Sequence, residues 1–136
     1  MAETFRFELV SPERVLVSAD VGEVLVPGSE GDFTVLPRHA PVIAMLRPGI
    51  LRIPGMDGRL SEIYVRGGLA DVGPDSLTVL AEEAVPLAEV DRAFIDGQIS
   101  SAEADVADAR DEDTRRLAED TLERLRSLSE TLNLAA

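Results

Sequence analysis

The sequence predicts an α+β protein in which strands and helices occupy separate segments. We expect an N-terminal β-sandwich of about eight to ten short strands, followed by a C-terminal antiparallel two-helix hairpin. The distribution of Pro and Gly carries this prediction. All 8 Pro and all but one of the 10 Gly lie at or before residue 86, whereas long runs after it contain neither. Two domains are therefore expected, residues 1–86 and residues 87–136.

The first half alternates short apolar segments with turn signals. Phe5, Phe7 and Leu9 recur at every second position, so the first segment has one apolar face. Similar segments follow at residues 15–17, 21–26, 33–36, 42–46, 49–53, 60–66, 69–72 and 77–81. Turns are expected between them at Pro27-Gly28, at Gly67-Gly68 and, as a tight hairpin, over Met56–Arg59. Short strands at this spacing indicate a sandwich or a flattened barrel.

The second half shows two apolar stripes at helical spacing. They consist of Ile95, Ile99, Ala102, Val106 and Ala109, and then of Leu117, Ala118, Thr121, Leu122, Leu125, Leu128 and Leu132. Glu89 and Asp91 are expected in the first turn of the first helix, where the helix dipole favours acids. Asp111 or Asp113 is expected to cap the second helix. Because the connection is short, the helices must pack antiparallel. The first stripe is mostly small, so we expect a marginally held hairpin.

The composition excludes several classes of protein. The chain has 26 acids against 13 bases, all of them Arg, for a net charge of −13. Such a chain is repelled by nucleic acid and by anionic lipid. Cys is absent, so no disulfide, thiolate metal site or cysteine nucleophile is expected. No signal peptide is expected, because the N-terminal residues show no basic region followed by an apolar core. No apolar run approaches ~20 residues, so direct insertion into a membrane is not expected.

One stretch, Val26–Pro41, holds three Pro, two Gly and the only His of the chain. Pro and Gly at these spacings predict a rigid, exposed loop, although ordinary β-turns explain the same residues. Ser29, Asp32 and His39 are the residue types of a hydrolase triad. However, Pro-Gly-Ser-Glu-Gly lacks the strained Gly-x-Ser-x-Gly elbow, and it also lacks the Gly-Lys-Ser/Thr ending of a phosphate loop. The chain is therefore not expected to be an enzyme, nor to hold a metal.

Several segments, in this order, resemble the epsilon subunit of bacterial F-type ATP synthases, whose mitochondrial counterpart is called delta. The most specific pair is Pro-Gly-Ser-Glu-Gly-Asp-Phe at residues 27–33 and Leu-Pro-Arg-His-Ala-Pro at residues 36–41. Phe7–Arg14, Arg47–Leu51, Tyr64–Val72 and Leu77–Glu82 match as well. The resemblance covers essentially the whole chain, but the helical half matches by architecture more than by letters.

The resemblance implies a non-catalytic central-stalk subunit, peripheral to the cytoplasmic face of the bacterial inner membrane. Such a subunit binds the gamma subunit and the c-ring and couples proton flow to rotation. Carried over by position, Ser29, Glu30, Gly31 and Asp32 would contact the c-ring, and Arg38, His39, Ala40 and Pro41 would contact gamma. An exposed acid such as Asp32 can accept charge-assisted bonds from a partner's cation.

The resemblance also implies that the hairpin can extend into the alpha/beta catalytic head and block ATP hydrolysis, and that ATP can act as a regulatory ligand. No cofactor is required. Candidate ATP-binding residues are Glu89, Arg92, Arg124 and Arg126. The family motif reads Ile/Leu-Asp-x-x-Arg-Ala, and here Ala88 and Glu89 depart from it. As the resemblance implies, extension into the head requires attraction to an acidic segment of the catalytic subunits. From residue 87 onward the chain has 6 Arg and 13 acids, so weak inhibition is predicted. An ATP-sensing inhibitory module and a free-standing β-sandwich adaptor remain the alternatives.

Overall fold

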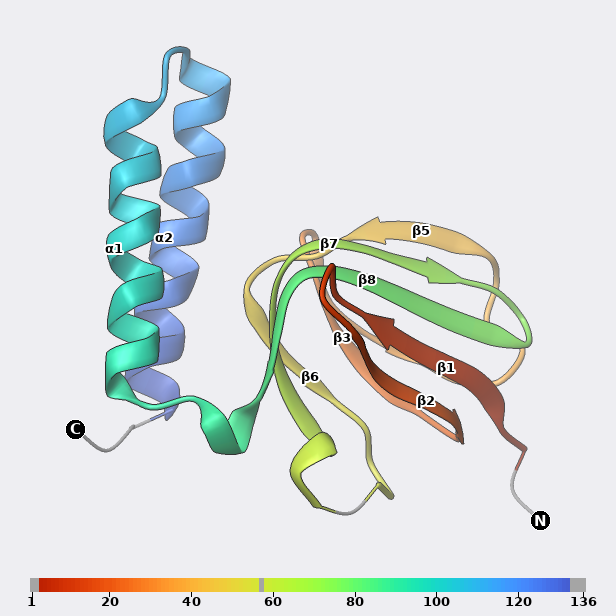
Figure 1. The fold of residues 1–136 in the computed structure, drawn as a ribbon. Helices are drawn as coiled ribbons and strands as arrows, with labels where there is room; N and C mark the ends of the chain where they lie inside the picture. The colour runs from red at the N-terminus through yellow and green to blue at the C-terminus, as the bar shows by residue number, and fades with distance from the viewer. Residues whose placement is uncertain (1–2, 57, 133–136) are drawn as a thin grey trace. The chain divides into compact units, whose positions relative to one another are not determined.

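The computed structural model describes residues 3–56 and 58–132 (Figure 1). The chain divides into two compact units, residues 1–88 and residues 89–136, while the change in composition lies at Pro86. The first unit holds β1 (Phe5–Val10), β2 (Val15–Val21), β3 (Val24–Gly28), β4 (Gly31–Val35), β5 (Val42–Met45), β6 (Gly49–Arg52), β7 (Glu62–Val72) and β8 (Ser76–Pro86). The second holds α1 (Arg92–Asp108) and α2 (Glu112–Leu132). The predicted β-sandwich followed by two helices is confirmed.

The strands form one hydrogen-bonded path, β2-β1-β8-β7-β6-β3-β4, and β5 pairs with β7 beside it. The two long strands, β7 and β8, take part in both layers of the sandwich (Figure 1). The first half of β7 pairs with β6 and its second half with β5. The first half of β8 pairs in parallel with β1, a long-range pairing that local sequence patterns do not reveal. Every strand except β5 contributes buried side chains to the core between the layers.

Gly67 and Gly68 lie inside β7, so the prediction of a turn between two separate strands was wrong. Both residues have positive φ, 73° and 105°. A Cβ on Gly68 would lie 1.9 Å from the Leu80 carbonyl oxygen. Glycine is therefore required here for close approach as well as for conformation. The Gly-Gly pair bends a continuous strand instead of ending it.

Two other expected turns also differ in detail. Pro27 and Gly28 belong to β3, and the chain reverses at Ser29-Glu30 before β4 begins at Gly31. Asp57 lies outside the described residues. A 3-10 turn over Gly58–Leu60 follows it in place of the predicted hairpin.

The core is mostly aliphatic, with Phe5 and Phe7 as its buried aromatic members, in keeping with an aromatic content of only 4%. The first strand shows the expected alternation, since Phe5, Phe7 and Leu9 are buried and Arg6 is exposed. The largest fully buried members of the sandwich core are Phe7, Leu9, Leu51, Ile53, Ile63 and Leu77. Burying a side chain of this size stabilises the fold by about 1.5–3 kcal/mol.

The helical unit is a hairpin of two packed helices (Figure 1). Asp91 caps α1 by accepting from the Phe94 amide at 2.8 Å, and Asp111 accepts from the Thr114 amide at 2.7 Å at the start of α2. Of the two predicted caps for α2, Asp111 is therefore the one used. No described helix is both long and apolar enough to cross a membrane.

Two predictions about the helices were wrong. Glu89 lies in a 3-10 turn, Leu87–Glu89, because α1 begins only at Arg92. Leu117 was placed on the apolar stripe of α2 but is 70% exposed. The buried residues of the two helices are Ile95, Ala102, Leu125 and Leu128.

Candidate functional site: a docking surface on the sandwich

The turn between β3 and β4 presents Ser29 and Glu30, both exposed. Gly28 and Gly31 form the last pair of this hairpin. A Cβ on Gly28 would lie 2.7 Å from the Gly31 carbonyl oxygen and 3.0 Å from the Phe33 ring, so only glycine fits. Gly31 has a φ of 135°, in the region that favours glycine. The sequence thus specifies a tight turn with two polar side chains at its tip.

Hydrogen bonds to Met45 and Arg47 hold this turn in place. The Ser29 amide donates to the Met45 carbonyl at 2.8 Å, and the Arg47 amide donates to the Pro27 carbonyl at 3.0 Å. Arg47 Nη2 donates to Asp32 Oδ1 at 3.1 Å, with the two side chains 33% and 60% exposed. Asp32, whose carboxylate is expected to bind a cation of the partner, is therefore already paired with Arg47 of the same chain.

The Arg38–Pro41 segment follows the other end of β4. The Arg38 amide donates to the Pro74 carbonyl at 2.7 Å and the His39 amide to the Leu36 carbonyl at 3.2 Å. His39 Nδ1 donates to the Ala40 carbonyl at 2.7 Å, since that oxygen can only accept. The His39 ring lies 6.5 Å from the Phe33 ring, centroid to centroid. The only His is thus a fixed part of a loop.

These two segments are not brought together. Asp32 stands near one end of β4 and Arg38 beyond the other. Three strand residues, Phe33–Val35, carry the chain from Asp32 to the end of β4, on the order of 10 Å at about 3.4 Å per residue, and two further residues precede Arg38. Ser29, Asp32 and His39 consequently form no catalytic constellation. Among the described residues, no group of three or more His, Cys, Asp or Glu side chains could hold a metal ion.

A row of apolar side chains on the outer face of one layer was missed by sequence reasoning. Cross-strand pairing aligns its five members, one from each neighbouring strand: Met45, Leu69, Leu80, Val10 and Val15. We call this set the apolar row. Met45 is 58% exposed, Leu80 46% and Val15 56%. Such an exposed apolar patch marks an interaction site more often than chance.

Other exposed apolar side chains lie on β5 and just after β4. Ile43 is 68% exposed and lies two positions before Met45 on β5, so both point to the same side. Leu36, just before the Arg38 segment, is 51% exposed. The uninterrupted apolar run at residues 42–46 was the available signal, because a strand that is apolar on both faces must either be buried on both or expose one.

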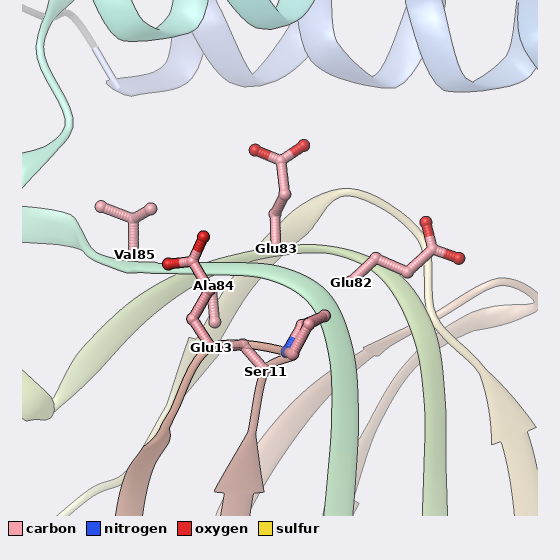
Figure 2. Close-up of a pocket in the computed structure, with 7 residues that line it drawn as sticks. Ser11, Glu13, Glu82, Glu83, Ala84 and Val85 are labelled. Carbon is pink, nitrogen blue, oxygen red and sulfur yellow. The ribbon is translucent and has the colours of Figure 1, made fainter.

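The pocket at the β1–β2 turn does not form a site. It has a volume of about 190 Å³ and is lined by Ser11–Glu13 and Glu82–Val85. Figure 2 shows the carboxylates of Glu13, Glu82 and Glu83 pointing in different directions rather than toward a common centre. Glu82 also lies against Gly67, where an added Cβ would be 2.5 Å from its carboxylate oxygen.

The four candidate ATP-binding residues lie on the helical unit. Arg92 Nη1 donates to Ser129 Oγ at 2.5 Å, and Arg126 Nη2 donates to Glu103 Oε2 at 3.2 Å. Both interactions join α1 to α2. Glu89 is exposed on the 3-10 turn, and Arg124 is half-buried on α2. Two of the three candidate cations thus already link the helices to each other.

Comparison with known proteins finds one family over most of the chain. Residues 4–87, more than half of the chain, match the family described as ATP synthase, Delta/Epsilon chain, beta-sandwich domain. The ATP synthase epsilon chain of Parvibaculum lavamentivorans is 48% identical over 132 residues, covering 97% of this chain and 100% of that one. That of Mesorhizobium japonicum is 46% identical over 128 residues, covering 94% and 95%.

Solved structures agree with the sequence matches. A chain of the Euglena gracilis mitochondrial ATP synthase, solved with OSCP, F1 and c-ring, superposes with a TM-score of 0.68 at 25% identity, covering 95% of this chain and 81% of that one. A chain of the Tetrahymena thermophila mitochondrial ATP synthase central stalk and c-ring shares the fold, with a TM-score of 0.56 at 12% identity, covering 89% and 98%. Full-length identity, the matched domain and the sandwich-plus-hairpin architecture together show that this chain belongs to the ATP synthase delta/epsilon family.

Proposed function

We propose that this chain is a non-catalytic rotor subunit of a proton-translocating F-type ATP synthase, which docks the gamma subunit to the c-ring. The apolar row carries this proposal. Its five aligned members, with Ile43 beside them, offer a protein partner a continuous apolar strip across one layer. Apolar area of this kind is stabilising only when a partner covers it.

The gamma subunit is the partner proposed for the apolar row and for the Arg38–Pro41 segment. A shaft that rotates with this subunit needs a permanent contact, and permanent interfaces are the more hydrophobic ones. The segment ends at Pro41, one residue before β5, and β5 supplies Ile43 and Met45 to the same surface. Loop and strand thus supply polar and apolar parts of one interface.

The Ser29–Asp32 turn is proposed to face the polar loops of the c-ring. Two backbone hydrogen bonds and the Arg47–Asp32 ion pair hold it, so it can transmit torque with little deformation. Exposed polar groups fix register and orientation more than they add affinity. We further propose that the assembled subunit lies at the cytoplasmic face of the inner membrane.

Reconstitution tests this function. ATP synthase stripped of this subunit, in membrane vesicles, is mixed with the full chain, and retention on the vesicles and ATP-driven proton pumping are measured. The proposal expects the chain to remain bound and pumping to recover. A chain that stays in the supernatant with neither gamma nor c-ring attached would instead be a free-standing adaptor.

A second candidate function, ATP sensing by the hairpin, is favoured by one observation. Arg92 on α1 bonds to Ser129 on α2, which lies one turn from Arg126, so two candidate cations belong to neighbouring positions of the hairpin. Phosphate would have to displace Glu103 from Arg126, which argues for weak binding. A thermal-shift titration of the full chain with ATP distinguishes the two functions, because only a sensor gains stability as ATP is added.

A further inference from the structure

Arg38 is the only residue other than glycine that the described chain holds at positive φ, 66°. L-residues enter this left-handed region at an energetic cost because Cβ approaches the backbone, whereas glycine enters it freely. A long side chain at such a position therefore calls for a reason. Outliers of this kind cluster at binding sites, where the strain is offset elsewhere.

The backbone of the loop explains the conformation but not the side chain. Pro37 fixes its own φ immediately before, and the Arg38 amide donates to the Pro74 carbonyl at 2.7 Å. Both features would be the same with glycine at position 38. The turn requires the left-handed backbone, and nothing in it requires a guanidinium.

The internal partner of Arg38 does not supply the reason either. Arg38 Nη2 donates to Glu3 Oε1 at 2.7 Å, but the two side chains are 78% and 57% exposed. Ion pairs this exposed contribute little to folding, because water screens them and two long side chains must be ordered. Glu3 does orient the guanidinium, which lowers the entropy lost when a further acceptor binds.

The surroundings of Arg38 resemble an interface contact. Leu36, two residues before it, is 51% exposed, and Ile43, five residues after it, is 68% exposed. Arg is one of the residue types enriched among those that dominate binding energy. The guanidinium offers five N–H donors in a fork that fits a carboxylate. In a chain with 26 acids and 13 bases, an exposed cation also contrasts with the general charge.

We propose that Arg38 is a specificity-determining contact of the docking surface, and that its guanidinium binds an Asp or Glu carboxylate of the gamma subunit. This inference rests on the proposed function, because it assumes that gamma covers the Arg38 segment. The guanidinium is exposed and paired with Glu3, and the partner's carboxylate takes remaining donors as Leu36 becomes covered.

The test separates backbone strain from side-chain binding. Arg38→Gly removes both the strain and the guanidinium, whereas Arg38→Ala removes only the guanidinium. Arg52→Ala is the matched control, because Arg52 on β6 is an exposed Arg that pairs with the exposed Glu62 on β7. Each full-length variant is titrated against synthase stripped of this subunit, at two salt concentrations, and its Tm is measured alone.

We expect Arg38→Gly to melt about 2–4 °C above Arg38→Ala, since glycine relieves the strain. Both should bind the stripped synthase roughly tenfold more weakly than wild type, with less dependence on salt, and Arg52→Ala should bind like wild type. If wild type binds and both Arg38 variants bind equally well, this inference is overturned while the proposed function stands. If wild type itself does not bind, the proposed function fails first.

Discussion

Arg47 anchors the Asp32 carboxylate to the body of the sandwich, through a 3.1 Å hydrogen bond from Nη2 to Oδ1. Arg47 is the less exposed partner, and its Nε lies buried with no acceptor among the described residues. Asp32 is the more exposed member and faces solvent. Asp32 therefore offers solvent a carboxylate that the Arg47 hydrogen bond orients.

Asp32→Ala should leave the fold intact and loosen the chain from the rotor. An ion pair at this exposure contributes no more than about 1 kcal/mol to folding, so the Tm should fall by only a few degrees. Docking should weaken because the oriented carboxylate is lost. Retention on reconstituted synthase vesicles, measured after washing in low salt, reports it.

Two variants make that result specific. Asp32→Asn keeps an acceptor for Arg47 but removes the charge, so it separates turn geometry from charge. Asp20→Ala is a matched control, since Asp20 is an exposed acid, 68% on its side chain, that pairs with Arg6 at 3.7 Å on β2. Equal retention of Asp32→Ala and Asp20→Ala would mean that the β3–β4 turn is only a turn.

Gly68→Ala should destabilise the sandwich by about 3 kcal/mol or more. The new Cβ would meet the Leu80 carbonyl oxygen at 1.9 Å, a backbone atom that cannot move aside, and the φ of 105° adds strain. Gly55→Ala is the matched control, because Gly55 has a φ of 87° with nothing within 4 Å of the added Cβ, so only strain of about 1 kcal/mol is expected. Urea unfolding of both variants separates the cost of the close Cβ contact from the cost of backbone strain. Equal unfolding midpoints would show that the close contact at Gly68 does not destabilise the fold.

Replacing an exposed member of the apolar row should affect docking and not folding. Met45→Ser and Leu80→Ser remove side chains that are 58% and 46% exposed, so little burial is lost in the isolated chain. If gamma covers the row, each substitution should weaken docking by about 1–2 kcal/mol. Leu117→Ser on α2, at 70% exposure, serves as the control for losing an exposed apolar side chain outside the row. Unchanged titration curves for Met45→Ser and Leu80→Ser would remove the row from the interface.

Local signals predicted the parts of this fold that depend on neighbours in sequence. Alternation placed Phe5, Phe7 and Leu9 in the core, and Asp111 was recognised as a possible cap from its position alone. The Gly67-Gly68 pair was misread because glycine at positive φ serves turns and bends alike, and only the approach of Leu80 from another strand decides between them.

The docking surface was predictable only in part. The residues of the Ser29–Asp32 and Arg38–Pro41 segments were named from their resemblance to a family. The apolar row could not be, because its members come from five strands and align only through the pairing of β5, β7, β8, β1 and β2. The parallel contact of β1 with β8 joins residues about 70 positions apart in sequence, a separation over which no local pattern operates.

The cap at Asp111 should make the start of α2 sensitive to acid. Hydrogen bonds from the Thr114 backbone amide hold the pKa of Asp111 below its ordinary value of 3.8. A carboxyl whose pKa is lower in the folded chain stabilises it above the unfolded pKa, and that contribution is lost as pH falls through the folded value. Helicity by circular dichroism should therefore fall more on acidification below pH ~4 in wild type than in Asp111→Asn, which keeps an uncharged cap. Asp113→Asn, in the same turn, is the control, and identical acid profiles for wild type and Asp111→Asn would contradict the prediction.

Deletion of residues 87–136 should change ATP hydrolysis by the assembled synthase less than about twofold, because this helical segment is a poor match for an acidic target. It carries 6 Arg against 13 acids, so the whole hairpin is repelled by negative charge. Arg126 on α2 is already paired with Glu103 on α1. The exposed Glu119 and Glu123 add further negative charge to α2. Hydrolysis by synthase reconstituted with the full chain or the shortened chain measures the effect, and a several-fold rise on deletion would show strong inhibition. If charge sets the strength of inhibition, Glu119→Gln with Glu123→Gln should increase inhibition by the full chain, since removing two negative charges lowers the repulsion without changing a buried residue of α2.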